Sequence, residues 1–358
     1  MEVESCAKSP IKDLALVAIT RTHAGYFRIA LSLGWQALLW KILLREAEDS
    51  RIKMYFLTIL WSFSLLILVV LSLLYLLRCI FLLEMIKGEF SHHVGVNYLF
   101  APWISWLLIL ESAPFVTPKH VSFVVLWWVF AAPIVLLDVK IYGQWFTKGK
   151  SFLTAVANPS SHLSVVGNLV GARAASKMGW REVSLFLFSL GMVHYLVLFV
   201  TLYQRLSGGD LLPTILRPVF FLFFAAPSVA SLAWYSISGS FDTASKMMFF
   251  LSLFLFTSLI CRPSLFKKAM RKFNIAWWAY SYPITILALA STRYAQEVND
   301  VVAHAIRFFL SALSVLVIFG LLLFTAFHPK LLLSEDDPPL PSTAADATTF
   351  PNYYLSTK

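Results

Sequence analysis

The segment Tyr55–Ile80 reads YFLTILWSFSLLILVVLSLLYLLRCI, and its single charged residue is Arg78 near the C-terminal end. A helix needs about 20 apolar residues to cross a hydrocarbon core of roughly 30 Å. A helix that is apolar on every side suits contact with lipid. The segment therefore predicts a membrane-spanning helix.

Nine other segments have the same character. Of all residues, 59% are hydrophobic and only 13% are charged, whereas soluble domains average about 25% charged residues. The predicted spans are His23–Leu44, Tyr55–Ile80, His92–Ser112, His120–Tyr142, Pro159–Met178, Glu182–Leu206, Leu212–Ile237, Thr243–Cys261, Asn274–Tyr294 and Val301–Phe327. The sequence thus predicts an all-α polytopic membrane protein with ten transmembrane helices. We expect a short N-terminal segment over residues 1–22, a ten-helix transmembrane domain over 23–327 and a flexible polar tail over 328–358.

The odd-numbered spans differ from the even-numbered ones. The second, sixth and tenth spans are mainly Leu, Val and Phe, whereas the third, fifth, seventh and ninth contain proline with small polar residues. The first has Gly25, Ser32 and Gly34 instead. This alternation favours five helical hairpins, with an inner ring of five kinked helices around a pore and an outer ring against lipid. Pro133 in the fourth span departs from the pattern.

The four prolines of the inner spans are Pro102, Pro159, Pro227 and Pro283. Proline removes one backbone hydrogen bond and leaves the carbonyl four residues earlier without its usual partner. In lipid, protein or water must satisfy that carbonyl. Four prolines in alternate spans favour helices that border a water-accessible pathway. For any one of them, an ordinary packed kink is the alternative.

Aromatic residues stand close before three of these prolines: Phe100, Phe224 and Tyr282. A bulky ring in a narrow pore closes it sterically and by excluding water. We therefore predict that these residues form a pore gate. Packing between helices is the alternative for each ring.

Polar residues inside the inner spans include Asn158, His162, Ser228, Ser281 and Thr285. Anion conduction needs weak, distributed attraction, which hydroxyls and amides can supply. We predict that they line the pore, with hydrogen bonding between helices as the alternative. Two charged residues, Arg28 and Glu111, also fall within the predicted spans. Charged residues inside a membrane are functional candidates by default. Both are close enough to span ends to extend their charged groups to the membrane surface, which is the alternative.

Basic residues near span ends favour both termini in the cytosol. The preference depends heavily on the cluster Arg262–Lys272, because four basic residues in the first loop favour the reverse. Orientation explains most of the net charge of +10, with contact to anionic membrane lipids as an alternative. The charge alone is therefore weak support for anion transport.

Catalytic and metal-binding motifs are missing from the sequence. It contains no His-Glu-x-x-His, no Gly-x-Ser-x-Gly and no phosphate-binding loop, and its three cysteines are widely spaced. We expect no enzyme activity, no catalytic residue, no cofactor, no metal site and no nucleic-acid partner.

Five stretches carry a resemblance to a known family. They are Ile141-Tyr-Gly-Gln-Trp145, Ala157-Asn-Pro-Ser-Ser-His-Leu-Ser-Val-Val-Gly-Asn168, Leu198-Phe-Val-Thr-Leu-Tyr-Gln-Arg-Leu206, Phe223-Phe-Ala-Ala-Pro-Ser-Val-Ala-Ser231 and Ala276-Trp-Trp-Ala-Tyr-Ser-Tyr-Pro283. Together they closely resemble the plant slow-type (S-type) anion channels, which are related to bacterial tellurite-resistance proteins. The resemblance covers roughly residues 20–327, and the short tails resemble those of the smaller members.

The resemblance implies properties that the spacing of residues does not show. Such channels have five hairpins with quasi-five-fold symmetry, assemble as trimers with one pore per protomer, and pass chloride and nitrate across the plasma membrane. A phenylalanine on the ninth helix plugs their pore, and Tyr282 stands at that position here, which is a departure. Phe100 or one of its neighbours is the counterpart expected for a second aromatic on the third helix.

The resemblance leaves three functions open. The leading interpretation is a passive chloride and nitrate channel subunit, as a homotrimer or a heterotrimer with related subunits. The second is a secondary transporter for dicarboxylates such as malate, although no coupling site at mid-depth is evident. The third is a silent subunit that modifies a related channel.

Overall fold

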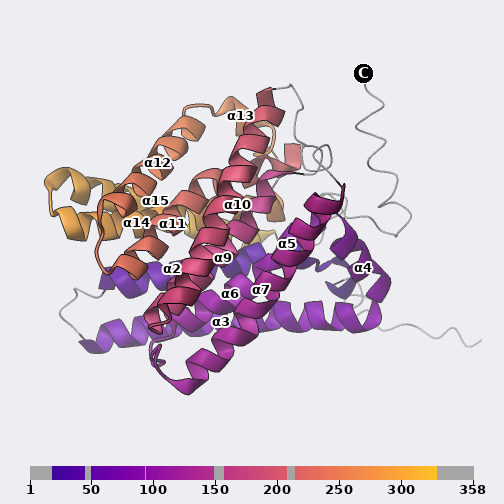
Figure 1. Cartoon of the computed structure of the whole chain (residues 1–358), viewed down its shortest axis with the longest axis horizontal. Coiled ribbons are helices and arrows are strands. Elements are labelled where there is room, and N and C mark those ends of the chain that lie inside the picture. The colour runs from indigo at the N-terminus through magenta and orange to yellow at the C-terminus, as the bar shows by residue number, and fades with distance from the viewer. Residues whose placement is uncertain are drawn as a thin grey trace, which may run out of the picture.

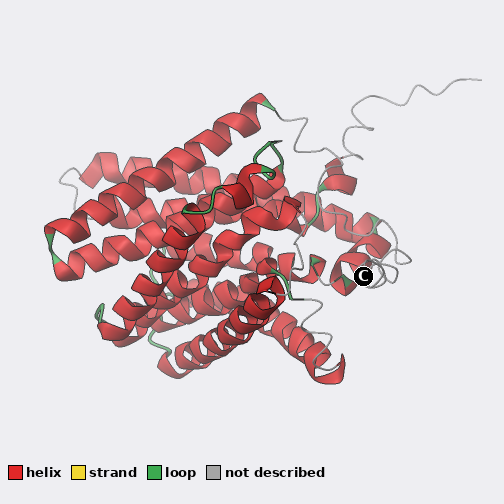
Figure 2. Cartoon of the chain, turned by 90° about the horizontal axis from the view of Figure 1, so that it is seen from above, coloured by secondary structure: helices red, strands yellow, loops and turns green. Residues whose placement is uncertain are grey.

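The computed structural model describes residues 18–44, 50–92, 94–148, 157–207, 214–271 and 273–328. This part of the chain is helical and contains no strand (Figure 2). Most of the predicted N-terminal segment and nearly all of the predicted tail lie outside the described residues. The all-helical polytopic class predicted from the sequence is confirmed.

Five long apolar helices expose much of their surface: α3 (Ser50–Phe81), α7 (Val121–Lys148), α10 (Arg181–Ser207), α12 (Thr243–Ile260) and α15 (Val301–Phe327). Large apolar side chains are exposed on each, among them Leu66, Trp128, Leu196, Phe254 and Phe319. Exposed residues of this kind suit a lipid environment. These five helices and Arg217–Ser238 are long and apolar enough to cross a membrane.

Five other helices are mostly buried: α2 (Phe27–Leu43), α6 (Phe100–Ser112), α9 (His162–Lys177), α11 (Leu222–Ser238) and α14 (Trp278–Val298). They contact one another in a closed cycle, in which α2 packs on α6, α6 on α9, α9 on α11, α11 on α14 and α14 on α2. Figure 1 shows the last hairpin, α14 and α15, lying beside α2 from the start of the chain. We call these five helices the inner ring.

Each long exposed helix packs against the inner-ring helix of its own hairpin. Thus α3 contacts α2, α7 contacts α6, α10 contacts α9, α12 contacts α11 and α15 contacts α14. Most of them also contact the next inner helix along the chain, as α3 does with α6 and α12 with α14. Because one exposed helix returns the chain between successive inner helices, the five inner helices run in the same direction.

The inner helices begin with a repeated device. A side chain accepts a hydrogen bond from the backbone N–H two residues later, and a 3₁₀ turn follows. His23 caps η1 (Ala24–Tyr26), Asn158 caps η3 (Pro159–Ser161) and Asn274 caps η5 (Ile275–Trp277). A further 3₁₀ segment, η4 (Thr214–Phe221), precedes α11. The caps satisfy backbone donors that would otherwise be left unpaired at buried helix starts.

The third predicted span is interrupted at its start. Helix α4 (Leu83–Ser91) meets the segment Gly95–Ser112 at an angle of 102°, and this segment contains α5 (Gly95–Tyr98) and α6. The side chain of His92 accepts hydrogen bonds from Val94 N and Gly95 N at the bend. The predicted start at His92 therefore coincides with the bend. The short helix α13 (Ser264–Lys267) lies in the loop after α12.

Two of the four prolines lie in the first turn of a helix and not in its interior, contrary to the expectation of four kinked helices. Pro159 is the first residue of η3, and Pro102 is the third residue of α6. Proline is tolerated in a first turn because the missing N–H has no intrahelical partner there. Pro227 and Pro283 do lie inside α11 and α14.

Serine hydroxyls donate to backbone carbonyls close to the two interior prolines. Three residues before Pro227, the Phe224 carbonyl accepts hydrogen bonds from Ser228 Oγ at 3.0 Å and Ser252 Oγ at 2.6 Å. Near Pro283, the Trp278 carbonyl accepts one from Ser32 Oγ at 3.3 Å. The hydrogen bonds from Ser252 and Ser32 join α12 to α11 and α2 to α14.

Candidate functional site

Tyr282 lies in the second turn of α14 and is the central residue of the candidate site. Its side chain is only 1% exposed. It interacts electrostatically with Arg28 of α2 and with Tyr98 of α5. These three residues come from three different helices, and all three side chains are buried.

Arg28 and Tyr98 also contact each other. The guanidinium carbon of Arg28 lies 4.8 Å from the centre of the Tyr98 ring, a distance suited to a cation–π contact. Both side chains are almost completely buried. The structure therefore removes the alternative in which Arg28 extends to the membrane surface.

The other two predicted gate residues are placed differently. Phe100 is the first residue of α6 and is fully buried, two residues beyond Tyr98. The ring of Phe224 lies 5.3 Å from that of Phe221 and 5.2 Å from that of Phe256 on α12. The Phe224 ring therefore packs between α11 and an exposed helix, which favours the packing interpretation for this residue.

The predicted polar lining divides in the same way. Ser228 bonds to Ser252 of α12, and Thr285 Oγ1 lies 2.8 Å from Ser314 Oγ of α15. These hydroxyls join inner helices to exposed helices. Ser281 is fully buried beside Tyr282, and its hydroxyl has no partner among the described residues.

Asn158 and His162 lie where α9 begins. The Asn158 side chain accepts a hydrogen bond from Ser160 N at 3.0 Å, so it serves as a helix cap. The His162 ring lies 4.8 Å from Phe223 and 5.9 Å from Tyr195, and its Nδ1 is 3.1 Å from the Pro159 carbonyl. The structure thus shows these residues organising the start of α9 between α10 and α11.

A buried carboxylate that the sequence did not single out lies on α7. Asp138 accepts a hydrogen bond from Asn168 Nδ2 at 2.6 Å and another from Ser164 Oγ, and Ser164 Oγ lies 2.8 Å from His194 Nδ1. All four side chains are buried between α7, α9 and α10. The available signal was a single acid inside the apolar span His120–Tyr142. The cluster lies between the inner ring and two exposed helices.

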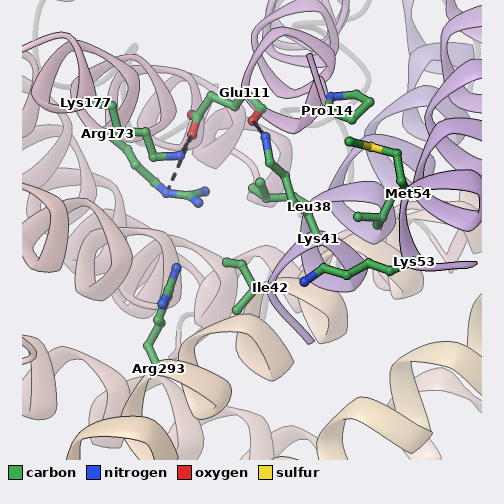
Figure 3. A pocket seen from close by; sticks show the side chains of 11 residues that line it. Leu38, Lys41, Ile42, Lys53, Met54, Glu111, Pro114, Arg173, Lys177 and Arg293 are labelled. Carbon is green, nitrogen blue, oxygen red and sulfur yellow. Dashed lines mark hydrogen bonds and ion pairs between the residues drawn. The ribbon is translucent and has the colours of Figure 1, made fainter. Parts of the chain in front are cut away.

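A strongly basic cavity opens at the end of the inner ring where α2, α6, α9 and α14 finish (Figure 3). Its volume is about 400 Å³. Five basic side chains and one carboxylate line it: Lys41, Lys53, Arg173, Lys177, Arg293 and Glu111. The excess of four positive charges makes this end of the ring attractive to anions.

Glu111 organises one wall of this basic cavity. Its Oε2 lies 2.5 Å from Lys177 Nζ and 3.7 Å from Arg173 Nε. Lys41 Nζ donates to the backbone carbonyls of Glu111 at 3.0 Å and Ala113 at 2.8 Å, where α6 ends. Figure 3 shows Arg293 and Lys53 on the other side of the cavity. Basic groups at helix C-termini also complement the helix dipole.

The sequence is similar to a family of known proteins over most of its length. A family model described as a voltage-dependent anion channel, SLAC1, matches residues 21–326. The chain is 58% identical to S-type anion channel SLAH4 of Arabidopsis thaliana, over 89% of this chain and 87% of that protein. It is 54% identical to S-type anion channel SLAH1 of the same plant, over 94% and 88%. For guard cell S-type anion channel SLAC1 the identity is 44%, over 87% and 56%.

Proposed function

Because this chain belongs to the SLAC1 voltage-dependent anion channel family, we propose that it is an S-type anion channel subunit that passes chloride and nitrate passively. The family consists of channels and not enzymes, as the sequence predicted. The observation that carries the proposal is the closed inner ring with Tyr282 inside it. Anions would cross the membrane along the axis of this ring.

We propose that all ten helices span the membrane, with quasi-five-fold symmetry between the hairpins. The inner helices α2 and α9 are short, but each continues from a capped 3₁₀ turn that adds to its reach. Both contain small and polar residues, such as Ser32 and Asn168, that are completely buried behind the exposed helices. The closed cycle of contacts and the common direction of the inner helices support this arrangement.

The basic cavity serves, in this proposal, as the extracellular mouth of the pore. With both termini in the cytosol, the inner helices begin at the cytosolic side, and the cavity at their C-terminal ends faces outward. A cleft with one sign of charge concentrates counter-ions at its entrance. Here the excess of basic residues would raise the local anion concentration beside the pore.

Tyr282 is the proposed gate, with Phe100 as its neighbour on α6. A buried aromatic ring inside the inner ring obstructs an ion both sterically and by excluding water. We assign Phe224 to packing, because its ring contacts α12. Pro283 follows Tyr282 directly inside α14 and has no backbone N–H to donate there.

The experiment compares anion currents of Tyr282→Ala, Tyr282→Phe and Phe224→Ala in oocytes, normalised to surface protein. We expect Tyr282→Ala to raise the chloride and nitrate current roughly tenfold, equivalent to about 1.4 kcal/mol of barrier. Phe224→Ala is the matched control, since it also removes a buried ring, and we expect no increase. If Tyr282→Ala reaches the cell surface and its current is unchanged, Tyr282 is not the gate.

The burial of Tyr282 also supports a second candidate function, that of a silent subunit. The side chains of Tyr282, Arg28 and Tyr98 are all buried, and Arg28 lies against the Tyr98 ring. A subunit closed in this way could alter a related channel within a mixed trimer. Co-expression with a longer relative tests this: a current found only in the mixture supports the silent subunit.

A dicarboxylate carrier is less well supported by the buried groups. Coupled transport needs an ion-binding or titratable site at mid-depth in the pathway. The buried carboxylate of Asp138 is held by Ser164 and Asn168 of α9, between that inner helix and the exposed helices α7 and α10. Saturating, proton-coupled malate uptake in place of a passive current would favour the carrier.

We place the protein in the plasma membrane as a trimer. Cell-surface labelling tests the location, and the mass of the purified complex tests the number of subunits.

A further inference from the structure

Arg28 has an arrangement that the gate alone does not explain. It is the second residue of α2, and its side chain is 1% exposed. Its Nε donates to the Gly25 carbonyl at 2.7 Å. Both terminal nitrogens, Nη1 and Nη2, are buried and have no hydrogen-bond partner among the described residues. Five possible N–H donors are thus concentrated in one guanidinium, and only one of them is used.

No carboxylate within the described ranges forms an ion pair with Arg28. The described ion pairs involve Arg78, Lys87, Arg173, Lys177 and His194 instead. A buried charge without a partner is strongly unfavourable, and arginine cannot lose its proton to escape the penalty. The contact with the Tyr98 ring compensates only part of that penalty. The site therefore lacks one negative charge.

The surroundings of Arg28 leave room and supply further donors. A side chain at Gly25 would place its Cβ 2.8 Å from Arg28 Nη2 and 2.5 Å from His23 Cε1, so glycine keeps this space open. The buried hydroxyl of Tyr282 lies within electrostatic range of the guanidinium. The parallel inner helices also direct the positive ends of their dipoles toward this end of the ring.

We propose that Arg28 binds one small monovalent anion inside the inner ring, beside Tyr282 and toward the start of the inner helices. The guanidinium fork offers two parallel N–H groups, which match a planar oxyanion of the nitrate type and also hold a halide. That the bound ion is the conducted anion rests on the proposed channel function. The existence of the site does not.

The bound anion gives the closed ring a specific character. It neutralises Arg28 and brings a negative charge next to the Tyr282 hydroxyl, which can donate to it. A second anion entering from the basic cavity would then meet both an aromatic ring and a like charge. Opening would require the Tyr282 ring to move and the bound ion to leave together.

The test measures thermal unfolding of the purified full-length protein, by tryptophan fluorescence, at constant ionic strength. Nitrate or chloride replaces gluconate stepwise. We expect the unfolding midpoint of the native protein to rise and saturate with nitrate or chloride, and the Arg28→Met variant to lose this saturable rise. Lys87→Met is the control, because Lys87 is an exposed cation of α4 outside both the inner ring and the basic cavity, and this variant is expected to keep the rise.

The sign of the effect in gluconate separates binding from a purely structural role. Without a binding anion, Arg28→Met removes an uncompensated buried charge, so its midpoint is expected to equal or exceed that of the native protein. A structural arginine predicts instead that Arg28→Met is less stable by the same amount in every anion. That result, or a native protein without saturable anion dependence, overturns the proposal.

Folding and function are monitored independently. If Arg28→Met does not give a monodisperse complex, Arg28→Lys replaces it in the test, because lysine keeps the positive charge but lacks the paired N–H groups of the guanidinium. For Arg28→Lys we expect the half-saturating nitrate concentration to rise at least tenfold, which corresponds to about 1.4 kcal/mol of binding energy. Because no step measures current, a protein that binds nitrate at Arg28 without conducting it would refute the channel and leave the site standing.

Discussion

Replacing Glu111 by glutamine removes the carboxylate that lines the basic cavity and keeps the shape of the side chain. The Glu111 side chain is fully buried, whereas those of Arg173 and Lys177 are 4% and 31% exposed. Lys177 can therefore turn toward the cavity when its partner is lost. Arg173 cannot, and its charge stays buried without a carboxylate.

The distances set the size of the effect. At an effective dielectric constant of about 20, separations of 2.5 Å and 3.7 Å correspond to gross attractions of about 6.6 and about 4.5 kcal/mol. Desolvation of the three charges offsets much of this. Removing one member of a buried pair typically destabilises a protein by about 3–5 kcal/mol, because the remaining charge is uncompensated. We expect Glu111→Gln to fall in this range.

Thermal unfolding of the purified protein in gluconate measures the loss, which corresponds to a midpoint lowered by roughly 10 °C. Glu84→Gln is the matched control, since Glu84 pairs with Lys87 at 2.7 Å but both side chains are largely exposed. An exposed pair contributes less than about 1 kcal/mol. Replacing gluconate by chloride is expected to recover part of the Glu111→Gln loss, because a small anion can enter the cavity and neutralise Arg173.

The reasoning fails if Glu111→Gln unfolds at the same temperature as Glu84→Gln. Such a result would mean that Arg173 and Lys177 are already well solvated. The cavity would then be an ordinary water-filled surface, without the strong field that the proposed anion mouth requires.

Three further predictions concern other parts of the fold. Asp138→Asn should lower the unfolding free energy by about 1–3 kcal/mol, because Ser164 or Asn168 loses its hydrogen-bond acceptor. The current per channel at the cell surface should stay the same, and a changed current would contradict this prediction. Asp242 caps α12 by accepting from Ser245 N at 3.0 Å, so Asp242→Ala should cost about 1 kcal/mol, and an unaltered midpoint would show that the cap is dispensable. Cys261 is exposed beside the basic cluster after α12; in a chain with its other cysteines replaced, an impermeant maleimide should label it only from the cytosolic side, and labelling of intact cells would reverse the topology.

The positions of the exposed helices could be predicted from the sequence because their apolar runs are long and uninterrupted. The span predicted over residues 301–327 coincides with α15, and that over 243–261 differs from α12 by one residue. The inner helices are less distinct, since burial behind other helices permits small and polar residues such as those around His162. Their 3₁₀ starts depend on caps that hydropathy does not reveal.

The candidate site could be predicted only in part. Family resemblance indicated Tyr282, but nothing in an apolar helix such as α11 shows which way Phe224 turns. The basic cavity was not predicted, because its residues come from five helices far apart in the sequence. Arg28 could be singled out as an embedded charge, whereas its missing partner became visible only when the surrounding helices were in place.

The inner ring is the anion pathway if an obstruction placed at residue 282 controls the current. The direct measurement is the current of Tyr282→Cys before and after a charged methanethiosulfonate reagent, with Phe224→Cys as control. We expect Tyr282→Cys to conduct and its current to fall sharply on modification, while Phe224→Cys does not respond. A Tyr282→Cys channel that is shown by mass spectrometry to be modified, and still carries its full current, would place the pathway elsewhere.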